Sequence, residues 1–132
     1  MSSSRYGRFR EDLPKYSELM YPVLVAVQVL GDVSERHQII DRAITSLGLA
    51  AEHLELEYLT APVVKDRCAW ALSYCTMAGT LERPRRSHYR LTDFGKEIVG
   101  LEEDTARERL RVLNQQVVSE ARARTRARKS KD

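Results

Sequence analysis

Basic side chains gather in one short stretch of the 132-residue chain, at Arg83, Arg85, Arg86 and His88. A guanidinium group stays charged at physiological pH, and its fork of N–H donors matches two oxygens of one phosphate group. The segment 81–92 surrounds the turn sequence RPRRS with apolar residues, and its last part alternates apolar and polar positions like a half-buried strand. These features predict a two-stranded hairpin whose basic tip contacts phosphates or a minor groove, with Arg90 supporting it from the outward strand face.

The residue types needed for covalent or metal-assisted catalysis are scattered. Cys68 and Cys75 are the two cysteines, and in one predicted helix their α-carbons are separated by roughly 10 Å, too far for a disulfide bond. His37, His53 and His88 have no metal-ligand spacing to one another or to the cysteines. The sequence also shows no nucleophile–base pair, carboxylate dyad or glycine-rich phosphate loop. We therefore expect two buried thiols, no metal, no cofactor and no enzymatic activity.

The net charge of +3 is divided unevenly along the chain. Residues 65–96 carry +4 and residues 122–132 carry +5, whereas residues 16–64 carry −5 and residues 97–121 carry −3. The first 15 residues carry a further +2. Positive charge on the predicted hairpin unit and on both ends favours a polyanionic partner over a solvated surface that is uneven by chance. We expect that partner to be double-stranded DNA.

Both ends of the chain are expected to act as basic arms. Residues 1–14 interleave arginines with aromatic residues, which predicts a flexible arm along a phosphate backbone or a minor groove, with an idle end as the alternative. Residues 122–132 alternate arginine with small residues and predict a disordered tail that adds salt-sensitive DNA affinity. The arginines assigned to DNA contacts in these arms are Arg5, Arg8, Arg10, Arg122, Arg124, Arg126 and Arg128.

Apolar periodicity predicts helices on both sides of the hairpin. A first helix covers 16–30, or alternatively begins at Pro22. A second helix begins after Ser34, which caps it, and ends at Gly48. Further elements are a helical piece at 51–56, a brief strand at 58–60, a third helix at 63–78, and a closing helix that Thr92 or Asp93 caps.

The third helix is the predicted recognition helix. Its apolar side chains gather on one face, and the opposite face is small and polar, which allows close approach to a groove floor. Lys65, Ser73 and Thr76 are assigned to DNA contacts, but side chains that read base edges are scarce, so we expect docking by shape and phosphate contact. Arg67 is also assigned to DNA, with a structural ion pair as the alternative. Trp70 is expected to be a core or boundary aromatic residue.

A long charged helix is expected from about residue 102. Leu110, Leu113 and Val117 lie at spacings that make a narrow apolar seam, which suits pairing with one other helix. The partner is either the same helix of a second copy or the body of the domain. We favour a homodimer through these three residues, because two copies would set two recognition units on DNA.

Residues 21–99 resemble the N-terminal winged-helix domain of Mrr-type restriction systems. The matching parts are Tyr21-Pro22-Val23-Leu24, Leu47-Gly48-Leu49, Arg67, Trp70-Ala71, Tyr74, the run AGTLERPRR at 78–86, Tyr89-Arg90-Leu91-Thr92 and Gly95. The resemblance implies a DNA-recognition part that in the family is attached to a separate nuclease domain. That nuclease needs a carboxylate two residues before a catalytic lysine, and none of the five lysines here has one. The chain departs from the family at 60–64 and at Asp66, whose negative charge would repel phosphate.

The expected fold is mainly α with a small β-hairpin. It comprises a flexible arm (1–14), a winged helix-turn-helix domain (15–100), a C-terminal helix (101–121) and a basic tail (122–132). We expect a cytoplasmic, nucleoid-associated DNA-binding protein that stands alone, contacts no membrane, and acts as a transcriptional regulator or a nucleoid-type binder. The alternative is an accessory or specificity subunit of a restriction or phage-defence system, which would bind a second protein subunit.

Overall fold

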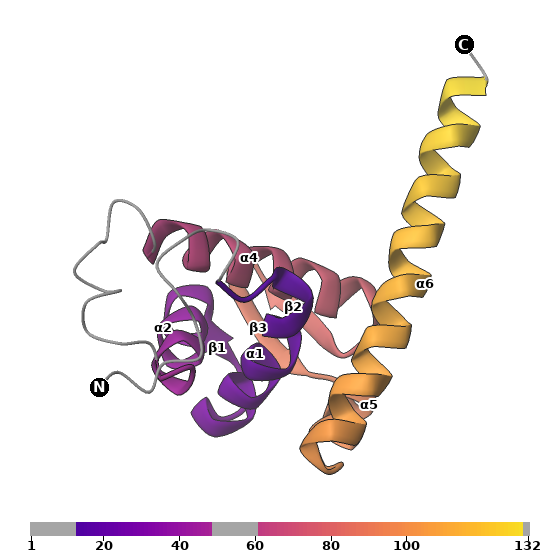
Figure 1. Ribbon diagram of the computed structural model, residues 1–132. Helices are drawn as coiled ribbons and strands as arrows, with labels where there is room; N and C mark the ends of the chain where they lie inside the picture. The colour runs from indigo at the N-terminus through magenta and orange to yellow at the C-terminus, as the bar shows by residue number, and fades with distance from the viewer. Residues whose placement is uncertain (1–12, 49–60, 131–132) are drawn as a thin grey trace.

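The structure is a computed structural model that describes residues 13–48 and 61–130 (Figure 1). As predicted, it is mainly helical with one small sheet. The described helices are α1 (Tyr16–Leu30), α2 (Arg36–Ser46), α4 (Ala61–Met77), α5 (Asp93–Val99) and α6 (Glu103–Ser130). The strands are β1 (Ser34–Glu35), β2 (Leu81–Arg85) and β3 (His88–Leu91). This order gives a winged-helix arrangement followed by a long helix, while the elements predicted at 51–56 and 58–60 lie outside the described residues.

The core lies between α1, α2 and α4. Periodicity assigned four apolar positions to the inner face of α1: Leu19, Val23 and Val27 are fully buried, whereas Leu30, at the end of the helix, is 41% exposed. The predicted inner face of α4 meets them with Val64, Cys68, Ala71, Leu72 and Cys75, all at 0% exposure. Across the described part of the chain, no helix is both long enough and apolar enough to cross a bilayer.

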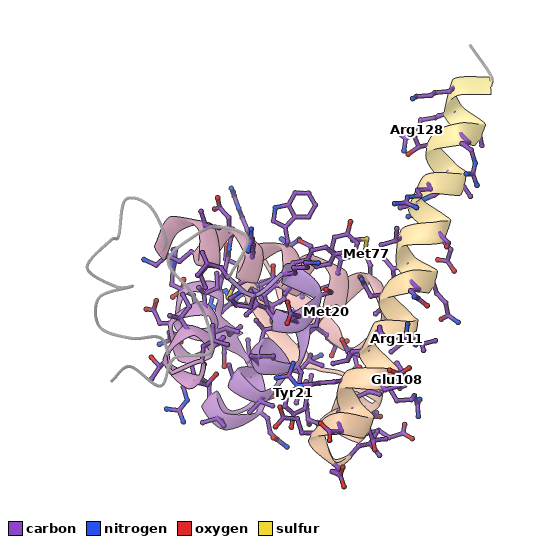
Figure 2. All side chains as sticks on the ribbon, viewed as in Figure 1. Met20, Tyr21, Met77, Glu108, Arg111 and Arg128 are labelled. Carbon is purple, nitrogen blue, oxygen red and sulfur yellow. The ribbon has the colours of Figure 1, made fainter. Side chains whose placement is uncertain are left out.

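Pro22 lies inside α1, so the alternative start of the helix at this residue is wrong. A proline here lacks the N–H that would bond to the carbonyl four residues earlier, at Glu18. Nη1 of Arg107, in α6, donates to that carbonyl oxygen at 3.1 Å, and its guanidinium lies 5.0 Å from the ring centroid of Tyr21. Figure 2 shows Tyr21 at this α1–α6 contact. A distant residue thus satisfies the backbone group that Pro22 leaves unpaired.

The sheet has three strands in the order β1-β3-β2, one more than the predicted hairpin. β1 pairs with β3 through Ser34 opposite Tyr89 and Glu35 opposite His88. The prediction that Ser34 caps the second helix is therefore wrong. Glu35 is the cap, and its side chain accepts a hydrogen bond from the backbone N–H of His37 at 3.4 Å. A two-residue strand is too short to show alternation in the sequence, which is why it was missed.

We call residues 81–91, which form β2, the turn and β3, the wing. Its turn holds Ser87 at a positive φ of 62°, and the ladder is irregular between Glu82 and Arg85. β2 is an edge strand, so Pro84 removes no sheet hydrogen bond that a neighbouring strand requires. The wing is therefore the hairpin that the sequence predicted, with a third strand attached to its inner side.

Close packing ties the wing to α5. Thr92 caps α5 by accepting a hydrogen bond from the backbone N–H of Gly95 at 3.0 Å, which confirms one of the two predicted caps. A Cβ at Gly95 would lie 2.0 Å from the carbonyl oxygen of Thr80, so only glycine fits there. That carbonyl accepts a hydrogen bond from the backbone N–H of Thr92 at 3.2 Å, and the contact therefore fixes the start of β2 against α5.

The apolar seam of α6 packs on the body of its own domain. Leu110 is 2% exposed, Val117 is buried and Leu113 is partly buried, and the helix contacts α1, α4 and α5. Within this chain the seam packs on the domain body, which was the alternative partner, and the homodimer through these three residues stays a prediction. Figure 1 shows that the C-terminal end of α6 projects away from the body.

The ends of the domain also differ from the predicted boundaries. Leu13 and Pro14 are buried, so they belong to the domain rather than to a flexible arm at 1–14. At the other end, α6 continues to Ser130, and the prediction of a disordered tail from residue 122 is wrong. Arg5, Arg8 and Arg10 lie outside the described residues.

Candidate nucleic-acid interface

A hollow of about 510 Å³ lies between the outer face of α4, the wing and the start of α2; we call it the wing hollow. Three residues assigned to DNA from the sequence line it together: Ser73 of α4, and Arg83 and Arg86 of the wing. Arg36 at the first position of α2 lines it as well, although no pattern in the sequence indicates it. The hollow therefore joins the predicted recognition helix to the predicted basic hairpin.

Arg36 reaches this position because of the short strand β1. Its backbone N–H donates to the carbonyl oxygen of Ser87 at 2.8 Å, which fastens the start of α2 to the turn of the wing. The pairing of β1 with β3 sets this register. A positive residue immediately after a strand of two residues carries no recognisable sequence signal, so Arg36 becomes visible only in the folded chain.

The wing hollow has an uncompensated positive charge. No aspartate or glutamate is among its described lining residues. Within residues 13–48 and 61–130, the ion pairs involve none of Arg36, Arg83 and Arg86. Arg83 lies over the ring of Tyr89, 5.8 Å from its centroid, which orients the guanidinium without neutralising it. Three unneutralised guanidinium groups around one hollow favour an anionic ligand.

Arg90 has a different environment from the other arginines of the wing. Its guanidinium pairs with Glu82 on β2, and this hydrogen bond is the main cause of the raised pKa of Arg90. Arg90 lines a separate hollow together with Asp32 and Asp93. The expectation that it supports DNA contact from the strand face is therefore corrected: it forms an intramolecular ion pair among acidic neighbours.

Arg67 also has an intramolecular role, in line with the structural alternative. Its Nη1 donates to the carbonyl oxygens of Leu13 and Pro14, at 3.2 and 3.1 Å. These bonds hold the chain that enters α1 against α4, on a part of α4 that does not line the wing hollow. The partner is a backbone carbonyl pair and not the carboxylate that an ion pair would require.

The remaining predicted contacts do not line the hollow. Lys65 and Arg85 are exposed on α4 and β2. Thr76 turns back to its own helix, where its hydroxyl donates to the carbonyl oxygen of Leu72 at 2.8 Å. Nδ1 of His88 lies 2.9 Å from the carbonyl oxygen of Arg86 at the turn. The structure thus places two of these residues on the open surface and two in local hydrogen bonds.

Trp70 is the largest departure from the predicted surface. Its side chain is 57% exposed, so the expectation of a core or boundary residue is wrong. It lines the wing hollow beside Met77, which is 51% exposed. Sequence periodicity placed Trp70 at the flank of the apolar face, where a shift of one position along the helix determines whether a side chain is buried or exposed.

A second hollow, of about 500 Å³, lies where α6 passes α1 and α4; we call it the α6 hollow. Tyr16 and Tyr74 line one side, and Arg122 and Arg126 line the other. Arg124 and Arg128 are also exposed on this part of α6. Arginines predicted for a disordered tail are thus held on a helix, two of them next to the body of the domain.

The two thiols have no exposed reactive group. Burial raises the pKa of Cys68 and of Cys75 to about 12, so both remain protonated at neutral pH. They are free cysteines, as predicted. Within the described residues, no group of His, Cys, Asp and Glu side chains is arranged to hold a metal ion.

The family comparison covers the part of the chain from α1 to α5. The model of the Mrr N-terminal domain matches residues 16–100, which is more than half of the 132-residue chain. The chain therefore belongs to the Mrr N-terminal domain family, whose name places it with restriction systems. The match ends before α6, so the family describes the winged helix and not the long helix. No curated protein and no solved structure matched the chain.

Proposed function

We propose that the chain binds double-stranded DNA through the wing hollow, with α4 towards the major groove and the wing on phosphates or the minor groove. The observation that carries the proposal is the convergence of Arg36, Arg83 and Arg86 on one hollow without a described carboxylate. Positive charge placed between a helix and a hairpin suits the backbone of a duplex. The match to the Mrr N-terminal domain supports the same conclusion.

The proposed contacts are mainly to the DNA backbone. Ser73 is the small polar side chain that α4 contributes to the hollow, beside the aromatic side chains of Trp70 and Tyr74. Asp66, exposed on the first part of α4, disfavours a phosphate nearby. Because phosphate contacts fix position and carry no sequence information, we expect affinity to depend strongly on salt and weakly on base sequence.

Charge reversal tests the proposed surface. Arg83→Glu/Arg86→Glu is expected to weaken duplex binding at low salt by at least tenfold and to lower the slope of log Kd against log salt by roughly two. The matched control is Arg42→Glu/Arg109→Glu, which changes the net charge equally at exposed positions outside the hollow. Equal weakening by both double variants would show a non-specific charge effect and would refute the surface.

We further propose that the domain acts as a transcriptional regulator or a nucleoid-type binder, without cleaving DNA. Family membership favours a second candidate, a DNA-binding accessory or specificity subunit of a restriction or defence system. Selection from a random duplex pool at two salt concentrations, with and without cytosine methylation, separates them. A selected motif supports a regulator, dependence on methylation supports the restriction role, and no selection supports a nucleoid role. Plasmid incubated with the protein and Mg²⁺ should stay uncut in every case.

A further inference from the structure

Trp70 belongs to a cluster of three aromatic rings on the surface of the domain. The rings of Tyr16 and Tyr74 stack with centroids 4.7 Å apart, and Trp70 stacks on Tyr74 at 6.1 Å with an interplanar angle of 15°. The ring of Trp70 also lies 6.4 Å from that of Tyr16, tilted by 40°, so each ring contacts the other two. The hydroxyl of Tyr16 hydrogen-bonds to the side chain of Asn114 in α6 at 3.3 Å. The cluster is therefore held from α1, α4 and α6, while Trp70 remains 57% exposed.

Guanidinium groups lie on both sides of this aromatic cluster. Tyr74 lines the wing hollow and also the α6 hollow, so the two hollows adjoin the cluster. Arg83 and Arg86 belong to the first hollow, and Arg122 and Arg126 belong to the second. None of the described residues lining either hollow is acidic. An apolar surface that binds another protein needs no flanking arginines. A single strand of nucleic acid carries charged phosphates and flat bases, so its binding site requires both guanidinium groups and an aromatic ring.

We propose that Trp70 is a stacking platform for an unpaired base of DNA, whose neighbouring phosphates are bound by the arginines of the two hollows. A paired base inside a duplex has both faces covered by its neighbours, so a ring that offers a free face selects a base that is unpaired. The preferred ligand is therefore single-stranded DNA or a duplex with an open region. The proposal deepens the proposed function, because the wing arginines serve both kinds of ligand.

Intrinsic fluorescence tests the stacking directly, because Trp70 is the one tryptophan in the chain. Three ligands are titrated: an oligothymidine strand, a dumbbell duplex with a central unpaired bubble, and a fully paired dumbbell duplex with the same short closed loops. Strong quenching by the strand and the bubble, with little quenching by the fully paired dumbbell at matched saturation, is the expected result. Emission that changes equally with all three ligands would overturn the proposal.

Substitution separates stacking from charge. Trp70→Ala is expected to weaken binding to the oligothymidine strand by roughly tenfold or more, and by a larger factor than it weakens duplex binding, with an unchanged salt slope. Trp70→Phe should retain most of the affinity because a ring remains. Val29→Ala, at an apolar side chain that is 54% exposed and lines neither described hollow, is the matched control. Circular dichroism of each variant checks that the fold is unchanged.

The path of the strand is tested at the second hollow. Arg122→Gln/Arg126→Gln should weaken single-strand binding several-fold more than Arg124→Gln/Arg128→Gln, which removes the same charge from exposed positions outside the hollow. Equal effects would refute the path across the aromatic cluster.

The outcomes distinguish this proposal from the duplex function. Loss of duplex binding in Arg83→Glu/Arg86→Glu, combined with equal affinities of Trp70→Ala and the unsubstituted protein for the oligothymidine strand, would refute the stacking site alone. Unchanged duplex binding in the charge-reversal variant would refute the proposed function. Trp70 emission that no bound DNA alters would leave the aromatic surface to a protein partner and would also overturn the stacking proposal.

Discussion

The two halves of α6 belong to one continuous helix but face different surroundings. In the first half, Ala106, Leu110 and Val117 are buried on the domain, and Arg107 and Arg111 pair with Glu103 and Glu108 of the same helix. From residue 118 onwards the helix carries four arginines and Lys129 against one acidic residue, Glu120, and its side chains become exposed. The first half gains stability from packing, whereas the second extends from it and offers charge.

This difference shows that the apolar seam of a helix predicts how wide its packing contact is, but not which surface packs on it. The seam is the same pattern whether a second copy or the domain itself covers it. Here the domain covers it as far as Val117, and the helix then continues beyond the surface on which it packs. Perturbations of the two halves should therefore have different effects, on stability in the first half and on DNA affinity in the second.

The largest effect on stability is expected at Leu110. Leu110→Ala leaves a cavity between α6 and the body and should lower the free energy of unfolding by about 2–5 kcal/mol. Val112→Ala is the matched control, because Val112 is 41% exposed on the same helix and should change stability by less than about 1 kcal/mol. Urea denaturation measures both, and equal losses would contradict the assignment of the seam to the domain.

The second effect separates affinity from stability. Replacing the four arginines Arg122, Arg124, Arg126 and Arg128 with glutamine should weaken duplex binding at low salt by about tenfold, because fewer counterions are released. The melting temperature should stay nearly unchanged, since the second half of α6 buries little apolar surface. Binding isotherms at several salt concentrations and thermal melts test the two statements. A large drop in melting temperature would show that this half also packs on the domain.

A smaller effect tests how α6 supports α1. Arg107→Ala removes the donor to the carbonyl oxygen of Glu18 and should cost about 1 kcal/mol in the free energy of unfolding. With Pro22→Ala, the N–H restored at residue 22 bonds to that carbonyl, so the cost of Arg107→Ala should become smaller. A double-mutant cycle by urea denaturation measures this coupling. Identical costs in both backgrounds would show that the two residues act independently.

The sequence predicted those features that depend on local pattern. The wing and the inner face of α4 follow from alternation and helical periodicity, and both are found where expected. Ser34 was misassigned because its pairing with Tyr89 depends on a residue far along the chain. Non-local pairing of this kind leaves no trace in a stretch of two residues.

The candidate site was only partly predictable for the same reason. Arg86 and Arg90 are close in sequence, yet the fold places one at the wing hollow and pairs the other with Glu82. Arg36 joins the site through β1, and Trp70 is exposed because no described element covers it. Charge and aromatic content thus indicate a class of ligand, while the environment of each side chain depends on the register of the sheet and on the packing of helices.

The buried thiols of α4 can react only when the domain opens, so their reactivity reports the opening. The thiol of Cys75 faces the carbonyl oxygen of Met20 in α1 at 3.8 Å, so a reagent can reach it only when α1 and α4 separate. Because the pKa of both thiols in the folded chain is about 12, against 9.0 for an open thiol, ionisation above pH 9 favours the unfolded chain. Stability should therefore be unaffected by these groups below pH 9 and should fall progressively between pH 9 and 12.

Alkylation rates followed by mass spectrometry provide the measurement. At pH 8 the folded protein should react with iodoacetamide far more slowly than in denaturing urea, and the ratio of the two rates gives the free energy of the opening that exposes each cysteine. Equal rates in the folded and unfolded protein would show that the α1–α4 contact opens freely. The alkylation rates of these two cysteines therefore report how often α1 and α4 separate, without any added label.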